Sequence, residues 1–155
     1  SQVMEDMEQE EWTAEELQWA KAMNQPVEDQ RKAAVKTFGL EPESQLFTGV
    51  APIGKGITYA STDVGDVAHI VPTGMATVAT AGLGAPGHSW QMVSSSGGSI
   101  GLKGMIYAAK ILAAAGVRLA ENPELVKKAK EEFDEMMNGE AYVCPIPEGM
   151  EIPKN

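Results

Sequence analysis

Residues 99–120 are almost wholly apolar, with the sequence Ser-Ile-Gly-Leu-Lys-Gly-Met-Ile-Tyr-Ala-Ala-Lys-Ile-Leu-Ala-Ala-Ala-Gly-Val-Arg-Leu-Ala. The charged residues of this stretch are Lys103, Lys110 and Arg118. On a wheel of 3.6 residues per turn these three fall within roughly 80° of one another, which leaves the rest of the circumference apolar. The pattern predicts one long helix that other parts of the protein cover on most of its surface.

Two shorter helices are predicted near the N-terminus. Thr13 and Glu16 have the spacing of a capping box, in which the hydroxyl accepts a backbone amide and the carboxylate reaches back, so a helix is expected from about 14 to 24. Pro26 favours the start of the next helix, and Gly39 supplies the left-handed residue that ends it.

A last helix is predicted from Asn122-Pro123 to about Asn138, with Gly139 as its stop. Its apolar residues recur at helical spacing, and we expect them to face inward. They are Leu125, Val126, Ala129, Phe133 and Met136.

Between the two helical regions the pattern changes to short β-prone runs divided by glycine and proline, at 57–60, 67–71 and 75–81, followed by a Gly/Ser loop at 82–98. The expected fold class is therefore α/β, with helices packed on a short sheet of two to four strands. The order of helices, strands and helices differs from the alternation of a self-contained α/β domain. Together with a first residue, Ser1, that is not Met, this order leads us to expect part of a longer protein.

Charge and composition exclude several classes of protein. The chain has 155 residues, 43% of them hydrophobic, which is enough for one domain with a core. A net charge of −10 has the wrong sign for a nucleic-acid partner. Residues 1–11 form an acidic lead-in, expected to be flexible, and no membrane span or export signal is predicted. The single cysteine, Cys144, excludes an internal disulfide and favours a reducing, cytoplasmic location.

Polar chemistry is concentrated in the middle of the chain. Residues 46–120 hold two carboxylates, Asp63 and Asp66, and both histidines of the sequence, His69 and His88. His88 follows a run of glycines and a proline that present one imidazole on a shaped loop, whereas His69 falls in an apolar run and is expected to be a packed strand residue. The two aspartates could cap a turn, or they could support a metal with His88 as its nitrogen ligand.

Two glycine-rich motifs bear on nucleotide and anion binding. Residues 82–87 match G-x-G-x-x-G, but the helix does not open inside the glycine run and no acid follows at the required distance, so dinucleotide binding is rejected. The run from Ser94 to Ser99 precedes the long helix. It could either cap that helix or offer its free amides to an anion.

Several of these motifs together resemble the C-terminal end of amidohydrolases of the M20 metallopeptidase family. The resemblance covers roughly residues 12–150. Its motifs are Ser61-Thr-Asp-Val-Gly-Asp-Val67, Pro72-Thr73, Gly84-Ala-Pro-Gly-His-Ser-Trp-Gln91, Gly101-Leu-Lys-Gly-Met105 and Tyr142-Val-Cys-Pro-Ile-Pro147.

The resemblance implies that residues 12–155 are the C-terminal part of a catalytic domain without the inserted dimerisation domain of that family. The parent enzyme would carry a pair of divalent metals, zinc or manganese, and hydrolyse the amide bond of N-acyl or aminobenzoyl amino acids. His88 matches the last metal ligand of the family. The residues expected beside the metals or in the substrate pocket are Ser61, Asp63, Asp66, Gly87 and Ser89.

The general base and the other ligands of the family belong to segments that this chain lacks, so the isolated chain is expected to be inactive, with metal positions that can be empty. Its predicted partners are the small amide substrate of the parent and a second copy of the chain, because the long helix is apolar on too much of its surface to be covered within the chain. The alternative hypothesis is a non-catalytic module that binds a small anion or another protein.

Overall fold

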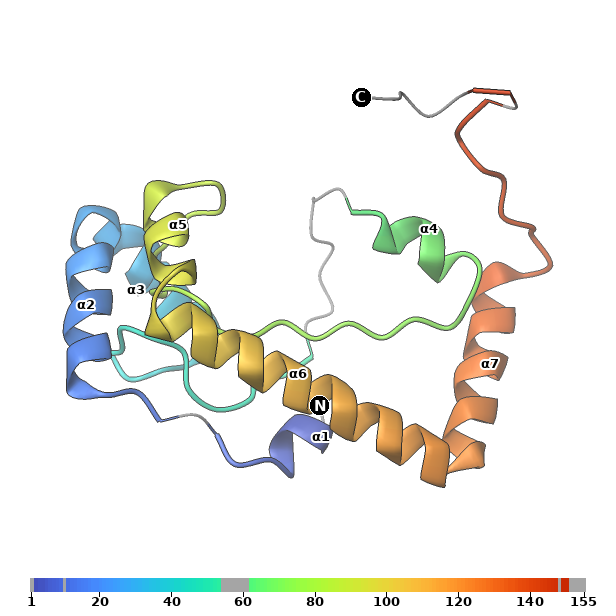
Figure 1. Cartoon of the computed structure of the whole chain (residues 1–155), viewed down its shortest axis with the longest axis horizontal. Helices are drawn as coiled ribbons and strands as arrows, with labels where there is room; N and C mark the ends of the chain where they lie inside the picture. The colour runs from blue at the N-terminus through green and yellow to red at the C-terminus, as the bar shows by residue number, and fades with distance from the viewer. Residues whose placement is uncertain (1, 10, 54–61, 148, 151–155) are drawn as a thin grey trace. The chain divides into compact units, whose positions relative to one another are not determined.

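The computed structural model describes residues 2–9, 11–53, 62–147 and 149–150. The chain divides into two units. Unit 1 comprises Ser1–Lys55 and Ala76–Val117, and unit 2 comprises Gly56–Met75 and Arg118–Asn155. The helices are α1 (Gln2–Glu5), α2 (Ala14–Asn24), the 3-10 turn η1 (Gln25–Val27), α3 (Glu28–Phe38), α4 (Val64–Ala68), α5 (Trp90–Ser96), α6 (Ser99–Glu121) and α7 (Pro123–Met137) (Figure 1).

The predicted helix signals of unit 1 are confirmed. Thr13 accepts the amide of Glu16 and the Glu16 carboxylate accepts the amide of Thr13, so α2 begins with the expected capping box. Pro26 lies in η1 rather than at the start of α3, and α3 ends at Gly39, whose φ of 64° is left-handed. The local sequence therefore determines where these helices begin and end.

The core of unit 1 is small and joins three separate segments. Ala20 of α2, Leu46 of the loop after α3 and Ile100 of α6 are at most 3% exposed and form one cluster, against which Trp12 packs. In Figure 1, α2, α3 and α5 gather around the N-terminal end of α6. The predicted long helix is thus confirmed and its buried residues supply one wall of this core, but the expected cover over most of its surface is not found, because Leu102, Met105 and Leu112 are 51%, 60% and 66% exposed.

An ion pair connects the start of α2 to α6. Lys103 Nζ donates to Glu16 Oε2 at 2.7 Å and to the carbonyl of Glu11 at 2.8 Å, and it lies 5.6 Å from the centre of the Trp12 ring. Burial raises the pKa of Glu16, but the hydrogen bonds from Lys103 and Thr13 outweigh it, so the pKa lies below its ordinary value. The same carboxylate caps α2 and attaches it to α6.

The expected α/β fold class is wrong for the part of the chain that the structure describes, because those residues are helical and form no β-sheet. Residues 67–71, predicted as a strand, lie at the end of α4 and in the turn after it. Residues 75–81 are extended, but no described segment pairs with them as a second strand. A β-prone run forms a strand only where a neighbour accepts its backbone hydrogen bonds. The predicted strand at 57–60 lies outside the described residues.

Unit 2 contains α4, the end of α6, α7 and the segment after α7. α7 starts at Pro123 as predicted and ends at Asn138, which has a φ of 47°. It buries none of its residues, so the prediction that its apolar residues face inward is wrong: Leu125, Val126 and Met136 are 39%, 50% and 65% exposed. Ion pairs along its surface, Lys127 with Glu131 and Lys130 with Asp134, support the helix locally.

Three helices, α1, α4 and α5, occupy regions where none was predicted. α1 lies in the acidic lead-in, and Gln9 after it donates to the hydroxyl of Tyr107 in α6 at 2.9 Å. α5 lies within the predicted Gly/Ser loop.

α6 is, by length and composition alone, apolar enough to cross a membrane, a property that it shares with core helices of globular proteins.

Candidate functional site

His88 lies in unit 1, on the loop that connects the extended segment 76–81 to α5. Its imidazole is exposed and its φ is 57°, so a residue with a side chain occupies the left-handed region. Such backbone conformations are enriched where a side chain is presented for function. The loop therefore offers one imidazole from an uncommon backbone conformation.

The residues on either side of His88 determine the shape of the loop. The hydroxyl of Ser89 donates to the carbonyl of Pro86 at 2.7 Å and accepts the amide of Met92 at 3.2 Å, which makes Ser89 the N-cap of α5. Gly87 has open space around the position of a Cβ atom. Ser89, predicted to lie in the substrate pocket, thus has a structural role in this chain that sequence analysis did not assign to it.

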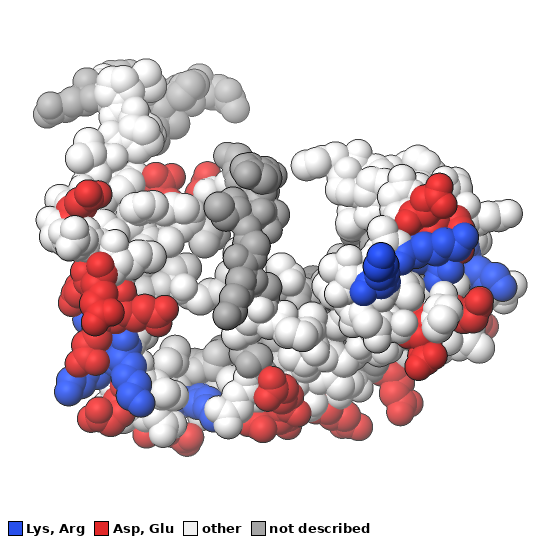
Figure 2. Space-filling model, turned by 180° about the vertical axis from the view of Figure 1, so that it is seen from behind, with Lys and Arg blue, Asp and Glu red and all other residues white. Residues whose placement is uncertain are grey.

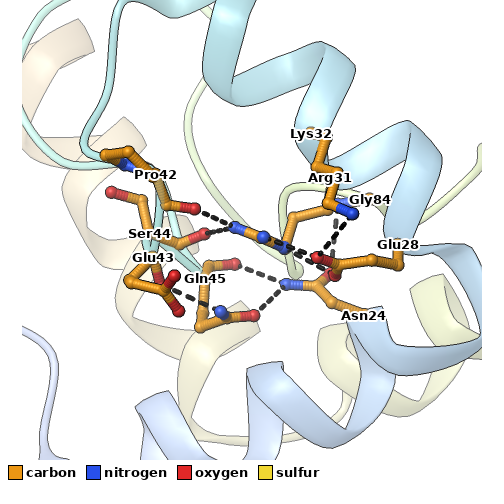
Figure 3. A network of polar contacts seen from close by, with 9 residues as sticks. All are labelled: Asn24, Glu28, Arg31, Lys32, Pro42, Glu43, Ser44, Gln45 and Gly84. Carbon is orange, nitrogen blue, oxygen red and sulfur yellow. Dashed lines mark hydrogen bonds and ion pairs between the residues drawn. The ribbon is translucent and has the colours of Figure 1, made fainter.

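The buried carboxamide side chain of Asn24 fixes the start of the same loop. Asn24, fully buried at the end of α2, accepts the amide of Gly84 at 3.1 Å through its Oδ1. Its Nδ2 donates to the carbonyl and the side-chain oxygen of Gln45, at 2.9 and 3.0 Å (Figure 3). The amide of Leu83 donates to the same carbonyl of Gln45 at 3.0 Å. Residues 83 and 84 are therefore anchored to two other segments.

Two glycines of the motif at 82–87 allow this close approach. A Cβ on Gly82 would lie 2.5 Å from Oδ1 of Asn24, and a Cβ on Gly84 would lie 2.8 Å from the carbonyl of Val27. Neither distance is compatible with a side chain unless something moves. We predicted that these glycines fix the shape of the loop. In the structure they allow the loop to pack closely against the end of α2 and the η1–α3 region.

Arg31 holds the segment that carries Gln45. Arg31 lies in α3 and its side chain is buried. The guanidinium makes a bidentate ion pair with the Glu28 carboxylate, at 2.7 and 2.8 Å. Its Nη1 also donates to the carbonyls of Pro42 and Ser44, both at 2.8 Å (Figure 3). The hydrogen bond with Glu28 raises the pKa of Arg31, and the bond from Arg31 lowers the pKa of Glu28. Sequence analysis missed both Asn24 and Arg31, because their partners are distant in the chain.

Asp63 and Asp66 lie in unit 2, at the start of α4, and both are exposed. Asp66 accepts a hydrogen bond from the hydroxyl of Tyr142 at 2.8 Å, and this bond raises the pKa of Tyr142 to about 12. Tyr142 and His69 also line an open groove of about 680 Å³ within unit 2. His69 is exposed and contacts the carbonyl of Gly65 at 2.7 Å, so it is not the packed strand residue that was predicted.

The predicted site residues divide between the units. His88, Gly87 and Ser89 belong to unit 1, Asp63 and Asp66 belong to unit 2, and Ser61 lies outside the described residues. The proximity of His88 to the two aspartates therefore stays a prediction. Among the residues that the structure describes, no group of three or more His, Cys, Asp or Glu side chains is arranged to hold a metal. The described residues alone therefore form no complete metal centre.

The charged surface shows no basic patch on the face in Figure 2, where Lys and Arg side chains lie beside Asp and Glu side chains.

Comparison with known proteins finds a similarity to a p-aminobenzoyl-glutamate hydrolase subunit of Escherichia coli (strain K12). The two sequences are 34% identical over 155 aligned positions, which cover 90% of this chain and 32% of the relative. The chain thus spans about a third of the length of that relative and is related to a hydrolase component. No model of a known protein family matches the chain. No solved structure matches it either.

Proposed function

We propose that this chain is the C-terminal part of a metal-dependent amidohydrolase that cleaves the amide bond of N-acyl or p-aminobenzoyl amino acids. The observation that carries the proposal is the 34% identity to a p-aminobenzoyl-glutamate hydrolase component across 90% of the chain. The placement of His88 on an anchored loop, in a left-handed conformation, supports a functional role for this residue.

In this proposal His88 contributes a neutral imidazole nitrogen to a metal whose other ligands come from outside the chain. A bound divalent metal would supply a water with a lowered pKa for attack on the amide carbonyl. The contribution of this chain is to hold the imidazole in place: Ser89 closes the loop behind it and the Asn24 contact fixes its start. The isolated chain would be inactive, because the general base and the remaining ligands would come from elsewhere in the parent enzyme.

The test compares the two histidines in the longer protein that carries this chain. His88→Asn is expected to remove hydrolysis of p-aminobenzoyl-glutamate and to lower the bound metal, because a ligand is lost, whereas His69→Asn keeps both. Metal content is measured by elemental analysis beside the assay. Full activity and full metal content in the His88 variant would refute the ligand role.

The alternative is a non-catalytic module that binds a small anion or a protein partner, for which the Ser94–Ser99 run before α6 is the candidate anion site. The sequence upstream of Ser1 in the gene separates the two proposals. A continuing reading frame that contains a His-x-Asp segment and a Glu-Glu pair supports the hydrolase, and their absence supports the module.

We also propose that the isolated chain associates with itself through α6. Leu102, Met105 and Leu112 of this helix are 51%, 60% and 66% exposed, and complete burial of such a side chain is worth about 1.5–3 kcal/mol, so covering the exposed part of each would give roughly half of that. A second copy is the simplest partner that could cover them. Sedimentation at micromolar concentration is expected to show a dimer or a larger species, and a clean monomer would contradict the proposal.

A further inference from the structure

We propose that Asn24 is a positioning residue for His88. The proposal rests on the proposed function for the meaning of His88, but the positioning itself concerns contacts within unit 1. Asn24 lies 64 positions before His88 in the sequence and has no place in the motifs that surround the histidine. Its connection to the loop is visible only in the folded chain (Figure 3).

Burial makes the contacts of Asn24 obligatory. The side chain is 0% exposed, and an amide removed from water must find partners inside the protein. It satisfies both of its ends: Oδ1 accepts from Gly84, and Nδ2 donates twice to Gln45. Replacing it with an apolar side chain would leave the amide of Gly84 buried and without that acceptor.

The contact from Asn24 lies where the loop begins. Gly84 is four residues before His88, and the loop closes again at the Pro86–Ser89 hydrogen bond. Between these two attachments the chain has little length in which to rearrange. We therefore expect a shift of the attachment at Gly84 to change the backbone conformation of His88, whose φ is positive.

The partners of Asn24 are themselves held in place. Gln45 follows the Pro42–Ser44 carbonyls that accept hydrogen bonds from Arg31 of α3, and Arg31 is 4% exposed. The path runs from Arg31 to the carbonyl of Ser44, along the backbone to the carbonyl of Gln45, and from there through Asn24 to Gly84, and its hydrogen bonds are of ordinary length within one unit. Hydrogen bonds to the α2–α3 region thus hold the start of the loop in place.

The test uses nuclear magnetic resonance on the isolated, metal-free chain, where His69 in unit 2 is an internal reference. In the unmodified chain the amide of Gly84 should exchange with solvent much more slowly than that of Gly87. In Asn24→Ala, Gly84 exchange should rise roughly tenfold, the factor for losing one hydrogen bond of ordinary strength. The imidazole and backbone signals of His88 should shift or broaden, while those of His69 stay unchanged.

Gln45→Ala is the matched control, because it removes one partner of Asn24 and leaves the bond to Gly84, so the His88 signals should stay in place. If Asn24→Ala does not fold, Gly82→Ala replaces it, since its Cβ would displace the Asn24 carboxamide without deleting it. Unchanged His88 signals in a folded variant of either kind would overturn the proposal, as would fast exchange of Gly84 in the unmodified chain.

A titration with Zn²⁺ alone separates this proposal from the proposed function. In the longer protein that carries this chain, Zn²⁺ is expected to perturb the His88 ring more than the His69 ring, and this preference should decrease in Asn24→Ala. If Zn²⁺ shows no preference for His88 in that protein, the ligand role fails, while the effect of Asn24 on the metal-free loop is still decided by the signals above.

Discussion

The loop at 82–89 in unit 1 and the segment at 62–69 in unit 2, which contains α4, share a composition of glycine, polar residues and one histidine, yet the chain holds them in different ways. The first is attached to the buried side chain of Asn24 and closed by Ser89. The second is mostly exposed, and its side chain Asp66 accepts an exposed hydrogen bond from Tyr142. A motif of this kind therefore becomes rigid through residues that lie outside it.

The energetic consequence of this difference follows from burial. A buried hydrogen bond is costly to break, because the partner that remains is unsatisfied away from water. An exposed bond can be replaced by water and contributes little. Substitutions in the first loop and its surroundings should therefore affect stability strongly, and matched substitutions in unit 2 should not.

The largest effect is expected from Ile100→Ala in the core of unit 1. Ile100 is 2% exposed, and removing three buried carbons should cost about 2–5 kcal/mol of unfolding free energy. All three tryptophans, Trp12, Trp19 and Trp90, belong to unit 1, so denaturation followed by fluorescence reports on this unit.

Leu125→Ala in α7 is the counterpart in unit 2. Leu125 is 39% exposed in a helix that buries no residue, so this variant should change stability by less than about 1 kcal/mol, as measured by circular dichroism. Equal losses in the two variants would contradict the contrast between the units.

A smaller effect is expected within the glycine motif itself. Gly84→Ala places a Cβ against the carbonyl of Val27, and overpacking of this kind costs about 1–3 kcal/mol. Gly87→Ala meets open space and should be within about 0.5 kcal/mol of the unmodified chain. Fluorescence-monitored denaturation compares the two, and a loss at Gly87 as large as at Gly84 would show that the anchoring is not what makes the motif sensitive.

The smallest effect on stability is expected from Asp66→Asn. The variant should lower the pKa of Tyr142 from about 12 toward the value near 10 of a free tyrosine, because the carboxylate that raised it is gone. A Tyr142 pKa that is higher in the folded chain than in the unfolded chain stabilises the fold at pH values below the unfolded pKa. This contribution is lost as the pH rises through the folded pKa. The difference in stability between the unmodified protein and Asp66→Asn should therefore appear at alkaline pH.

Ultraviolet titration of the tyrosines measures the shift, and Asp63→Asn is the control that should leave it unchanged. A Tyr142 that titrates near 12 without Asp66 would show that the exposed contact does not govern this residue.

Sequence analysis predicted the helices where a local signal exists. The capping box of α2, the left-handed Gly39 and the proline at the start of α7 act within a few residues, so periodicity and caps were sufficient. The strands predicted at 67–71 and 75–81 failed, because pairing depends on a neighbour that composition does not reveal: the run 75–81 is extended, as its residues favour, but without a described partner.

The candidate site was predictable in part. The glycines around His88 drew attention to the right loop, but their reasons, close approach to Asn24 and to Val27, depend on tertiary contacts. Asn24 and Arg31 carried no signal, because a polar residue in a helix is ordinarily exposed. Both side chains are buried in the folded chain, and their hydrogen bonds hold the loop in place.

The φ of 57° at His88 restricts what evolution can place at this position. Glycine, asparagine, aspartate and histidine tolerate the left-handed region best, whereas branched side chains are strained there. Histidine and aspartate are the members of that small set whose side chains are strong metal ligands. Most single substitutions at this position would therefore strain the backbone, whatever the chemistry of the new side chain. In related sequences we expect His88 to be replaced only by residues that tolerate a left-handed backbone conformation.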